Sequence, residues 1–184
     1  MDHEQFKSAA SYWIDRDAKA GSPGRMPAGE LRERVEGFLA AHKVCALATC
    51  AGGAPRCTPL EYDYRNGALW IFSEGGLKFR GLEPAEGANS APVSLAVFEP
   101  NAKFTQLASV QVDGRATIVD PSSPEFLDAV AAKGVGAAGS AALAAKVARF
   151  AEMLHLIKVV PTQVDLLDSS LKQQGYDVRQ HLVW

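Results

Sequence analysis

The chain has 184 residues, of which 47% are hydrophobic and 22% charged, so one globular domain with an apolar core is expected and dominant disorder is excluded. Its three cysteines, clustered between residues 45 and 57, do not suit a disulfide framework and favour a reducing compartment. Lys and Arg number 19 against 21 Asp and Glu, for a net charge of −2, which argues against nucleic-acid binding through a basic face.

Two short helices are expected before any strand. Apolar residues recur at helical spacing within residues 6–13 and again within 31–39, and Pro27 lies near the start of the second run. The glycines and prolines of residues 19–29 indicate the connecting loop. Each predicted helix therefore has one apolar stripe to bury.

The pattern then changes to that of strands. Residues 44–49 form a short apolar run, residues 56–64 alternate, and residues 68–72 form a third run after Asn66-Gly67, a strong hairpin signal. These runs predict an antiparallel meander.

The rest of the chain mixes strands and helices. We expect helical turns at 77–82, strands at 93–98 and 109–119, helices at 124–133 and 141–154, and two last strands at 156–160 and 163–167. Pro161 between the last two marks a bend or an edge. Six or seven strands with inserted helices predict an α+β protein, mainly β, built on a small barrel.

We interpret residues 1–184 as a single domain. Its parts are the N-terminal helices (1–42), the barrel core (43–120), a helical insertion (121–155), and the last strands with a C-terminal tail (156–184). The charged N-terminus does not suit a signal peptide, and lysines and glycines interrupt the low-polarity region 129–148, which does not fit a membrane span. We therefore expect a cytoplasmic protein that binds no membrane.

The common enzyme signatures are missing from the sequence. It has no GxxxxGK[ST] or GxGxxG phosphate loop, no HExxH and no CxxC. The four histidines, His3, His42, His155 and His181, have no carboxylate or cysteine at ligand spacing, so no metal site is expected. Catalytic residues stay unassigned.

Two polar clusters lie in the strand region. Ser73, the following glycines and Lys78 lie where a strand gives way to a helical turn, which brings N–H groups, a hydroxyl and an ammonium toward one anion. A solvated loop with a surface lysine is the alternative. In the second cluster, Arg56 and Thr58 share one face of a strand whose prolines indicate an edge that could address a planar ligand. Alternatively, Pro59 only protects an edge from aggregation.

The order of these segments resembles the flavin-binding split barrel of the pyridoxamine 5′-phosphate oxidase superfamily. Five segments in order carry the resemblance: 38–49, 55–60, 69–73 followed by Lys78, 91–97 and 110–116. It implies a homodimer of six-stranded antiparallel split β-barrels with flanking helices, and FMN bound in a groove between the subunits.

The resemblance also implies the site residues. They are Arg56, Cys57, Thr58 and Pro59 along the isoalloxazine ring, Ser73 and Lys78 at the phosphate, Gln111 reaching over from the partner subunit, and Phe72 and Trp184 as further cofactor-binding residues. Ser73 and Lys78 would hold the phosphate itself. The C-terminal tail would close over the site through Trp184, or Trp184 would simply pack on the barrel.

Departures from the superfamily's enzymes narrow the reaction. Glu61 stands where the namesake oxidase has a lysine that holds its substrate's phosphate, which disfavours vitamin B6 oxidation. Phe72 stands where the nitroimidazole-reductase branch has a histidine. The sequence Arg179-Gln180-His181 echoes the oxidase's Arg-x-His substrate pair, a weak match.

The favoured function is an FMN-dependent oxidoreductase that passes electrons from a reduced nicotinamide to a small acceptor, because the flavin itself supplies the chemistry. Two alternatives stay open: a split barrel that stores or senses flavin or haem without turnover, and a dimeric scaffold with no ligand. The sequence does not distinguish FMN from a deazaflavin.

Overall fold

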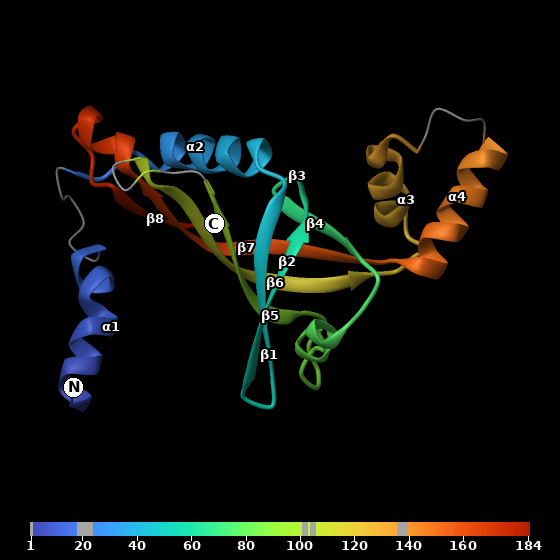
Figure 1. The fold of residues 1–184 in the computed structure, drawn as a ribbon, viewed down its shortest axis with the longest axis horizontal. Helices are drawn as coiled ribbons and strands as arrows, with labels where there is room; N and C mark the ends of the chain where they lie inside the picture. The colour runs from blue at the N-terminus through green and yellow to red at the C-terminus, as the bar shows by residue number, and fades with distance from the viewer. Residues whose placement is uncertain (1, 18–23, 101–102, 104–105, 136–139) are drawn as a thin grey trace.

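A curled antiparallel sheet forms the body of the protein (Figure 1). The computed structural model describes residues 2–17, 24–100, 103, 106–135 and 140–184. Within them the sheet has eight strands in the order β2-β1-β5-β6-β7-β4-β3, with β8 paired to β7. The strands are β1 (Val44–Ala51), β2 (Ala54–Glu61), β3 (Asp63–Arg65), β4 (Ala68–Ser73), β5 (Ala91–Phe98), β6 (Ala108–Val119), β7 (His155–Asp168) and β8 (Arg179–Val183). The predicted mainly β class is confirmed, with more strands than the six of the expected barrel.

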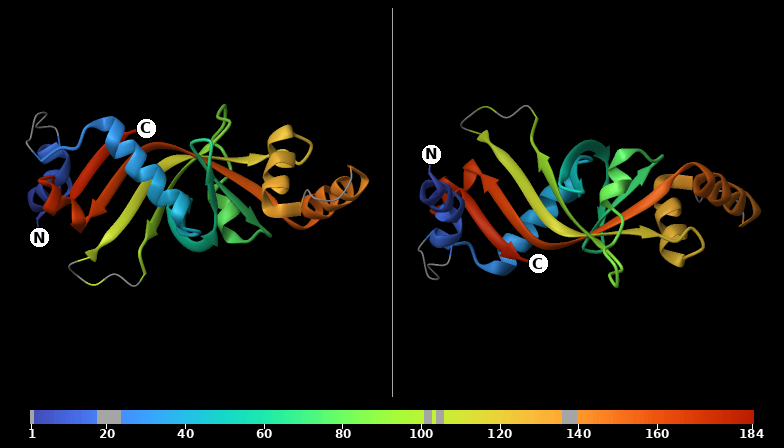
Figure 2. Two further views of the ribbon diagram at one scale, coloured as in Figure 1. Left: turned by 90° about the horizontal axis from the view of Figure 1, so that it is seen from above. Right: turned by 90° about the horizontal axis from the view of Figure 1, so that it is seen from below.

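Helices lie across one face of the sheet and at its two ends (Figures 1 and 2). They are α1 (His3–Asp17), α2 (Ala28–Ala41), η1 (Leu77–Gly81), α3 (Pro124–Val130), η3 (Ala131–Val135), α4 (Ser140–Met153) and η4 (Ser169–Gln174). Residues 19–23 of the predicted loop at 19–29 lie outside the described residues. Its last two residues, 28 and 29, are the first two of α2. None of the described helices is long and apolar enough to cross a membrane.

β7 is one continuous strand, where the sequence predicted two. It pairs with β6 along its length, with β4 in its first half and with β8 in its second half. The register between β6 and β7 shifts between Asp113 and Gly114, and Pro161 lies opposite Gly114 at that shift. A proline cannot donate to the ladder, so an irregularity at this point lets the strand continue.

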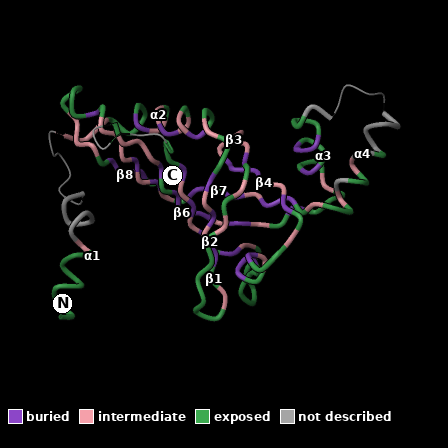
Figure 3. Tube along the Cα trace, in the orientation of Figure 1, coloured by how far each residue is buried: buried purple, intermediate pink, exposed green. Residues whose placement is uncertain are grey.

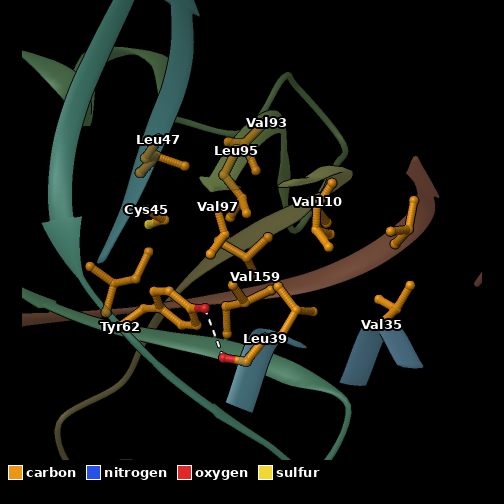
Figure 4. Close-up of a cluster of buried hydrophobic side chains, with 14 of the residues drawn as sticks. Val35, Leu39, Cys45, Leu47, Tyr62, Val93, Leu95, Val97, Val110 and Val159 are labelled. Carbon is orange, nitrogen blue, oxygen red and sulfur yellow. Dashed lines mark hydrogen bonds between the residues drawn. The ribbon is translucent and has the colours of Figure 1, made fainter. Parts of the chain in front are cut away.

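The main core lies between α2 and the sheet (Figure 4). Leu31, Val35 and Leu39 recur every four residues on α2 and are all buried, which is the apolar stripe that the sequence predicted. Tyr62, also buried, breaks the predicted strand at 56–64 into β2 and β3. Its hydroxyl donates a hydrogen bond of 2.7 Å to the carbonyl of Leu39.

A second core lies on the other face of β4. Phe126, Ala129 and Val130 of α3 pack there around Trp70. Ser123 caps α3, since its Oγ accepts a hydrogen bond from the backbone N–H of Phe126 at 3.3 Å. β4 is therefore covered on both faces, and its position between the two cores is fixed.

Residues 169–184 form η4 and β8 rather than a loose tail. Gln180 of β8 is buried, and its amide donates to the carbonyls of Gly24 and Asp177 at 2.9 and 2.7 Å. It also accepts a hydrogen bond from the backbone N–H of Met26 at 3.0 Å. The C-terminus is thus tied to the segment that leads into α2.

Candidate functional site

β2 is an edge strand, as the prolines predicted. It ends the strand order, with β1 as its one strand neighbour among the described residues, and most of its residues are exposed, as the hairpin in Figure 3 shows. Arg56 lies opposite the buried Thr49, and Thr58 lies opposite the buried Leu47. Residues directly opposite in an antiparallel pair share a face, so Arg56 and Thr58 point to the inner side. The residues that alternate with them, Pro55, Cys57 and Pro59, point to the outer side.

A buried lysine lies where β4 gives way to η1. Ser73 ends β4 and is 6% exposed, and Lys78 on η1 is 7% exposed. The Lys78 ammonium donates a hydrogen bond to the carbonyl of Gly75. Burial lowers the pKa of Lys78, and repulsion from Arg56 lowers it further, while Glu74 raises it. Two cations from separate elements therefore act on each other, and an anion placed between them would favour both charged forms.

The local sequence explains how Lys78 reaches this place. Gly75 and Gly76 have φ angles of 133° and 101°, which glycine adopts far more readily than other residues, and they turn the chain from β4 into η1. At the other end of η1, a Cβ on Gly81 would lie 2.7 Å from the backbone nitrogen of Cys50. Glycine at this position lets η1 lie directly against β1, which holds Lys78 against the β1–β2 hairpin.

Thr58 carries a buried hydroxyl without a partner. Its Oγ1 has no hydrogen-bond partner among the described residues. A buried polar atom in this state costs about 1–3 kcal/mol, and such atoms in native proteins call for an explanation. A ligand hydroxyl or carbonyl along the inner side of β2 would satisfy it.

An apolar cavity lies toward the other end of β2. It has a volume of about 470 Å³, within the size range of small-molecule pockets. It is lined by Ala41, His42, Lys43, Val44, Cys45, Ala46, Pro59, Phe98 and Pro100. Pro59 is opposite Ala46 in the β1–β2 register and lies about 10 Å along the strand from Arg56, at about 3.3 Å per residue. Pro59 alternates with Arg56 and Thr58 and points to the outer side. The cationic group on the inner side and the apolar cavity on the outer side thus lie toward two ends of one edge strand.

The structure does not bring the remaining predicted residues to this group. Phe72 packs edge-on against Phe126 of the second core, with ring centroids 6.0 Å apart. Gln111 is exposed on β6, between Ala96 of β5 and Asp165 of β7. A role for Gln111 toward a partner subunit stays a prediction.

Trp184 lies beside α2. The Arg32 guanidinium lies 4.1 Å from the centroid of its ring, and its backbone N–H donates to the carbonyl of Thr162 at 2.9 Å. The ring packs against the main core. This is the arrangement expected if Trp184 covers the barrel rather than a ligand.

Two histidines, His155 and His181, were not among the predicted site residues but have close neighbours in the structure. His155 is opposite Ser73 in the β4–β7 register, and its ring lies 5.1 Å from that of Phe79 on η1. His181 lies 2.8 Å from an oxygen of Asp165 through Nδ1. Only the strand register brings these pairs together, so spacing along the chain could not indicate them.

The curled antiparallel sheet, open at the edge strand β2, defines a split-barrel protein. The sequence model of the pyridoxamine 5′-phosphate oxidase family matches residues 31–168. The chain therefore belongs to the pyridoxamine 5′-phosphate oxidase family. No curated protein sequence matches it.

Solved structures share the fold at low sequence identity. A conserved hypothetical protein of Mycobacterium tuberculosis is 18% identical, with a TM-score of 0.58 over 84% of this chain and 92% of that one. An FAD-binding protein of Mesorhizobium loti is 22% identical, with a TM-score of 0.50 over 76% and 90%. HutZ, the haem storage protein of Vibrio cholerae, is 16% identical, with a TM-score of 0.52 over 71% and 89%. These likenesses establish a common fold, which is known to carry different functions.

Proposed function

We propose that this protein binds FMN across the free edge of β2, with the phosphate at Arg56, Ser73 and Lys78 on the inner side and the ring toward the apolar cavity on the outer side. The observation that carries the proposal is the buried Lys78, whose pKa is lowered by burial and by Arg56. A terminal phosphate dianion is the group that two adjacent cations and a hydroxyl suit best. Family membership and the FAD-binding neighbour in Mesorhizobium loti support a flavin.

The residues of the site would each have a separate task. Arg56 and Lys78 neutralise the phosphate and Ser73 donates a hydrogen bond to it. Thr58 offers its buried hydroxyl to the middle of the ligand, and the cavity at Pro59 keeps water from the ring. When bound, the flavin supplies the electron chemistry, and we propose that it passes electrons from a reduced nicotinamide to a small acceptor.

We further propose that the active form is a cytoplasmic homodimer. The outer face of β1 and β5 carries small side chains, Ala46, Ala48 and Ala96, next to the exposed Val44 and Phe98. Small side chains allow close approach of another backbone, and exposed apolar ones favour cover. A second copy on this face would bring its Gln111 toward the flavin site.

The first test is the visible spectrum of the purified protein and mass spectrometry of any ligand released by acid. Bound FMN that reduced nicotinamide bleaches under anaerobic conditions would support the proposal. Bound flavin that is not bleached would favour a storage or sensing protein, and a Soret band would favour haem, as in the Vibrio cholerae neighbour. A colourless protein that takes up no added FMN would refute flavin binding.

The site assignment needs a second test. We expect Lys78→Gln and Arg56→Gln each to weaken FMN binding by about tenfold or more, because each removes a charge-assisted contact to phosphate. Lys172→Gln is the matched control, since Lys172 is exposed on η4. Stoichiometric flavin in both site variants would refute the assignment.

A further inference from the structure

We propose that His155 is a fourth group of the anion site, beside Arg56, Ser73 and Lys78, and makes the site selective for a phosphomonoester. This inference rests on the proposed flavin function, because the flavin's phosphate is the anion concerned. It assigns a binding role to a residue that lies 77 positions from Lys78 in the sequence and that only the β4–β7 pairing brings close.

The strand register places His155 beside Ser73. The two are directly opposite in the antiparallel β4–β7 pair, so their side chains share a face and their Cβ atoms lie about 5 Å apart. The next pairs in this alternation, Ile71 with Ile157 and Leu69 with Val159, face the main core. Ser73 and His155 therefore continue that face to the rim of the sheet, where the core ends and η1 begins.

Phe79 links His155 to Lys78. The Lys78 ammonium lies 5.3 Å from the centroid of the Phe79 ring, and the His155 ring lies 5.1 Å from the same ring. The ammonium and the imidazole are therefore at most about 10 Å apart, the sum of these two distances. A phosphate at Ser73 would lie within reach of the electrostatic field of both.

The neighbouring elements carry three cationic and three acidic side chains, so their net charge does not select the ligand and the position of each charge does. They are Lys78 and Arg80 of η1, Arg56 of β2, Glu74 after β4, Asp120 after β6 and Glu152 near the end of α4. Of these, Lys78 is the buried one, and the shift of its pKa shows that it interacts with both Arg56 and Glu74. His155 is exposed, so its ring is accessible to a bound phosphate.

An imidazole can bind a phosphate oxygen through a ring N–H. It has such a donor whether it is neutral or protonated. The affinity for FMN should then depend on His155, and the affinity for riboflavin, which lacks the phosphate, should not.

The test compares FMN with riboflavin on the flavin-depleted full chain, with dissociation constants measured by flavin fluorescence at one fixed pH. We expect His155→Phe, which removes the donor but keeps a ring beside Phe79, to weaken FMN binding by about fivefold, with riboflavin binding unchanged. His155→Lys should keep tight FMN binding. His3→Gln is the control, because His3 is exposed on α1.

The outcomes separate this inference from the function on which it rests. If the wild-type protein binds no FMN, the proposed function fails and the inference fails with it. If His155→Phe binds FMN as tightly as the wild type, the inference alone is refuted. An equal loss of FMN and riboflavin also refutes it, since His155 would then act on the fold and not on the phosphate.

Discussion

The hydroxyl of Tyr62 should hold β2 in place through the C-terminus of α2, which makes Tyr62→Phe the most informative stability variant. Leu39 is in the last turn of α2, where backbone carbonyls have no partner within the helix, and Tyr62 supplies one at 2.7 Å. Both residues are fully buried. Removing the hydroxyl leaves a buried carbonyl unsatisfied, which costs about 1–3 kcal/mol. We expect a loss of about 2 kcal/mol in the free energy of unfolding.

Urea unfolding followed by circular dichroism measures this loss. With a slope of about 2 kcal/mol/M for a chain of this size, the midpoint should fall by about 1 M urea. Tyr64→Phe is a matched control, because the Tyr64 hydroxyl donates at 3.2 Å to the Glu36 carboxylate, which stays open to water at the helix surface. That variant should move the midpoint by less than about 0.3 M. Equal shifts in the two variants would refute the reasoning.

Two further predictions concern pH and thiol chemistry. Burial raises the pKa of Asp168, but hydrogen bonds from Ser170 and Arg34 outweigh it and lower the pKa below its usual value. The ionised carboxylate therefore stabilises the fold above about pH 4, and the contribution is lost as the pH falls through the lowered pKa. The melting temperature of the wild type should exceed that of Asp168→Asn at pH 6, and the gap should narrow as the pH falls below about 4; a constant gap would contradict this. Burial raises the pKa of the Cys45 thiol to about 12, so two thiols should react with a disulfide reagent in the folded protein and Cys45 only on unfolding. Added FMN should slow the reaction of Cys57, and an unchanged rate would count against flavin along β2.

The parts of the fold predicted correctly are those with a strong local cause. Asn66 and Gly67 both have positive φ angles, 52° and 71°, as a tight hairpin requires, and β3 and β4 pair around them. Pro55 and Pro59 remove backbone donors, so β2 had to lie at an edge. The family resemblance was likewise confirmed, since the order of segments is a property of the sequence itself.

The parts that were missed depend on residues far apart in the chain. β8 has a glutamine at a buried position, and Gln180 can occupy it only because Gly24 and Met26 satisfy its amide. No local alternation of polar and apolar residues signals that strand. In the same way, Phe72 belongs to the second core because α3 folds back over β4, which the sequence near residue 72 does not indicate.

The distribution of charge along β2 also gives the direction in which a flavin would lie. Arg56 and the nearby Lys78 make one end cationic, whereas Glu61 ends the strand opposite Val44, a residue that lines the cavity. The two basic side chains that line the cavity each have a carboxylate within 4 Å, His42 with Glu99 at 3.6 Å and Lys43 with Asp63 at 3.8 Å. An anionic group is therefore favoured at Arg56 and repelled at Glu61, and we expect the acceptor that meets the ring end to be uncharged or cationic. A phosphorylated acceptor that is reduced faster than its dephosphorylated form would contradict this orientation.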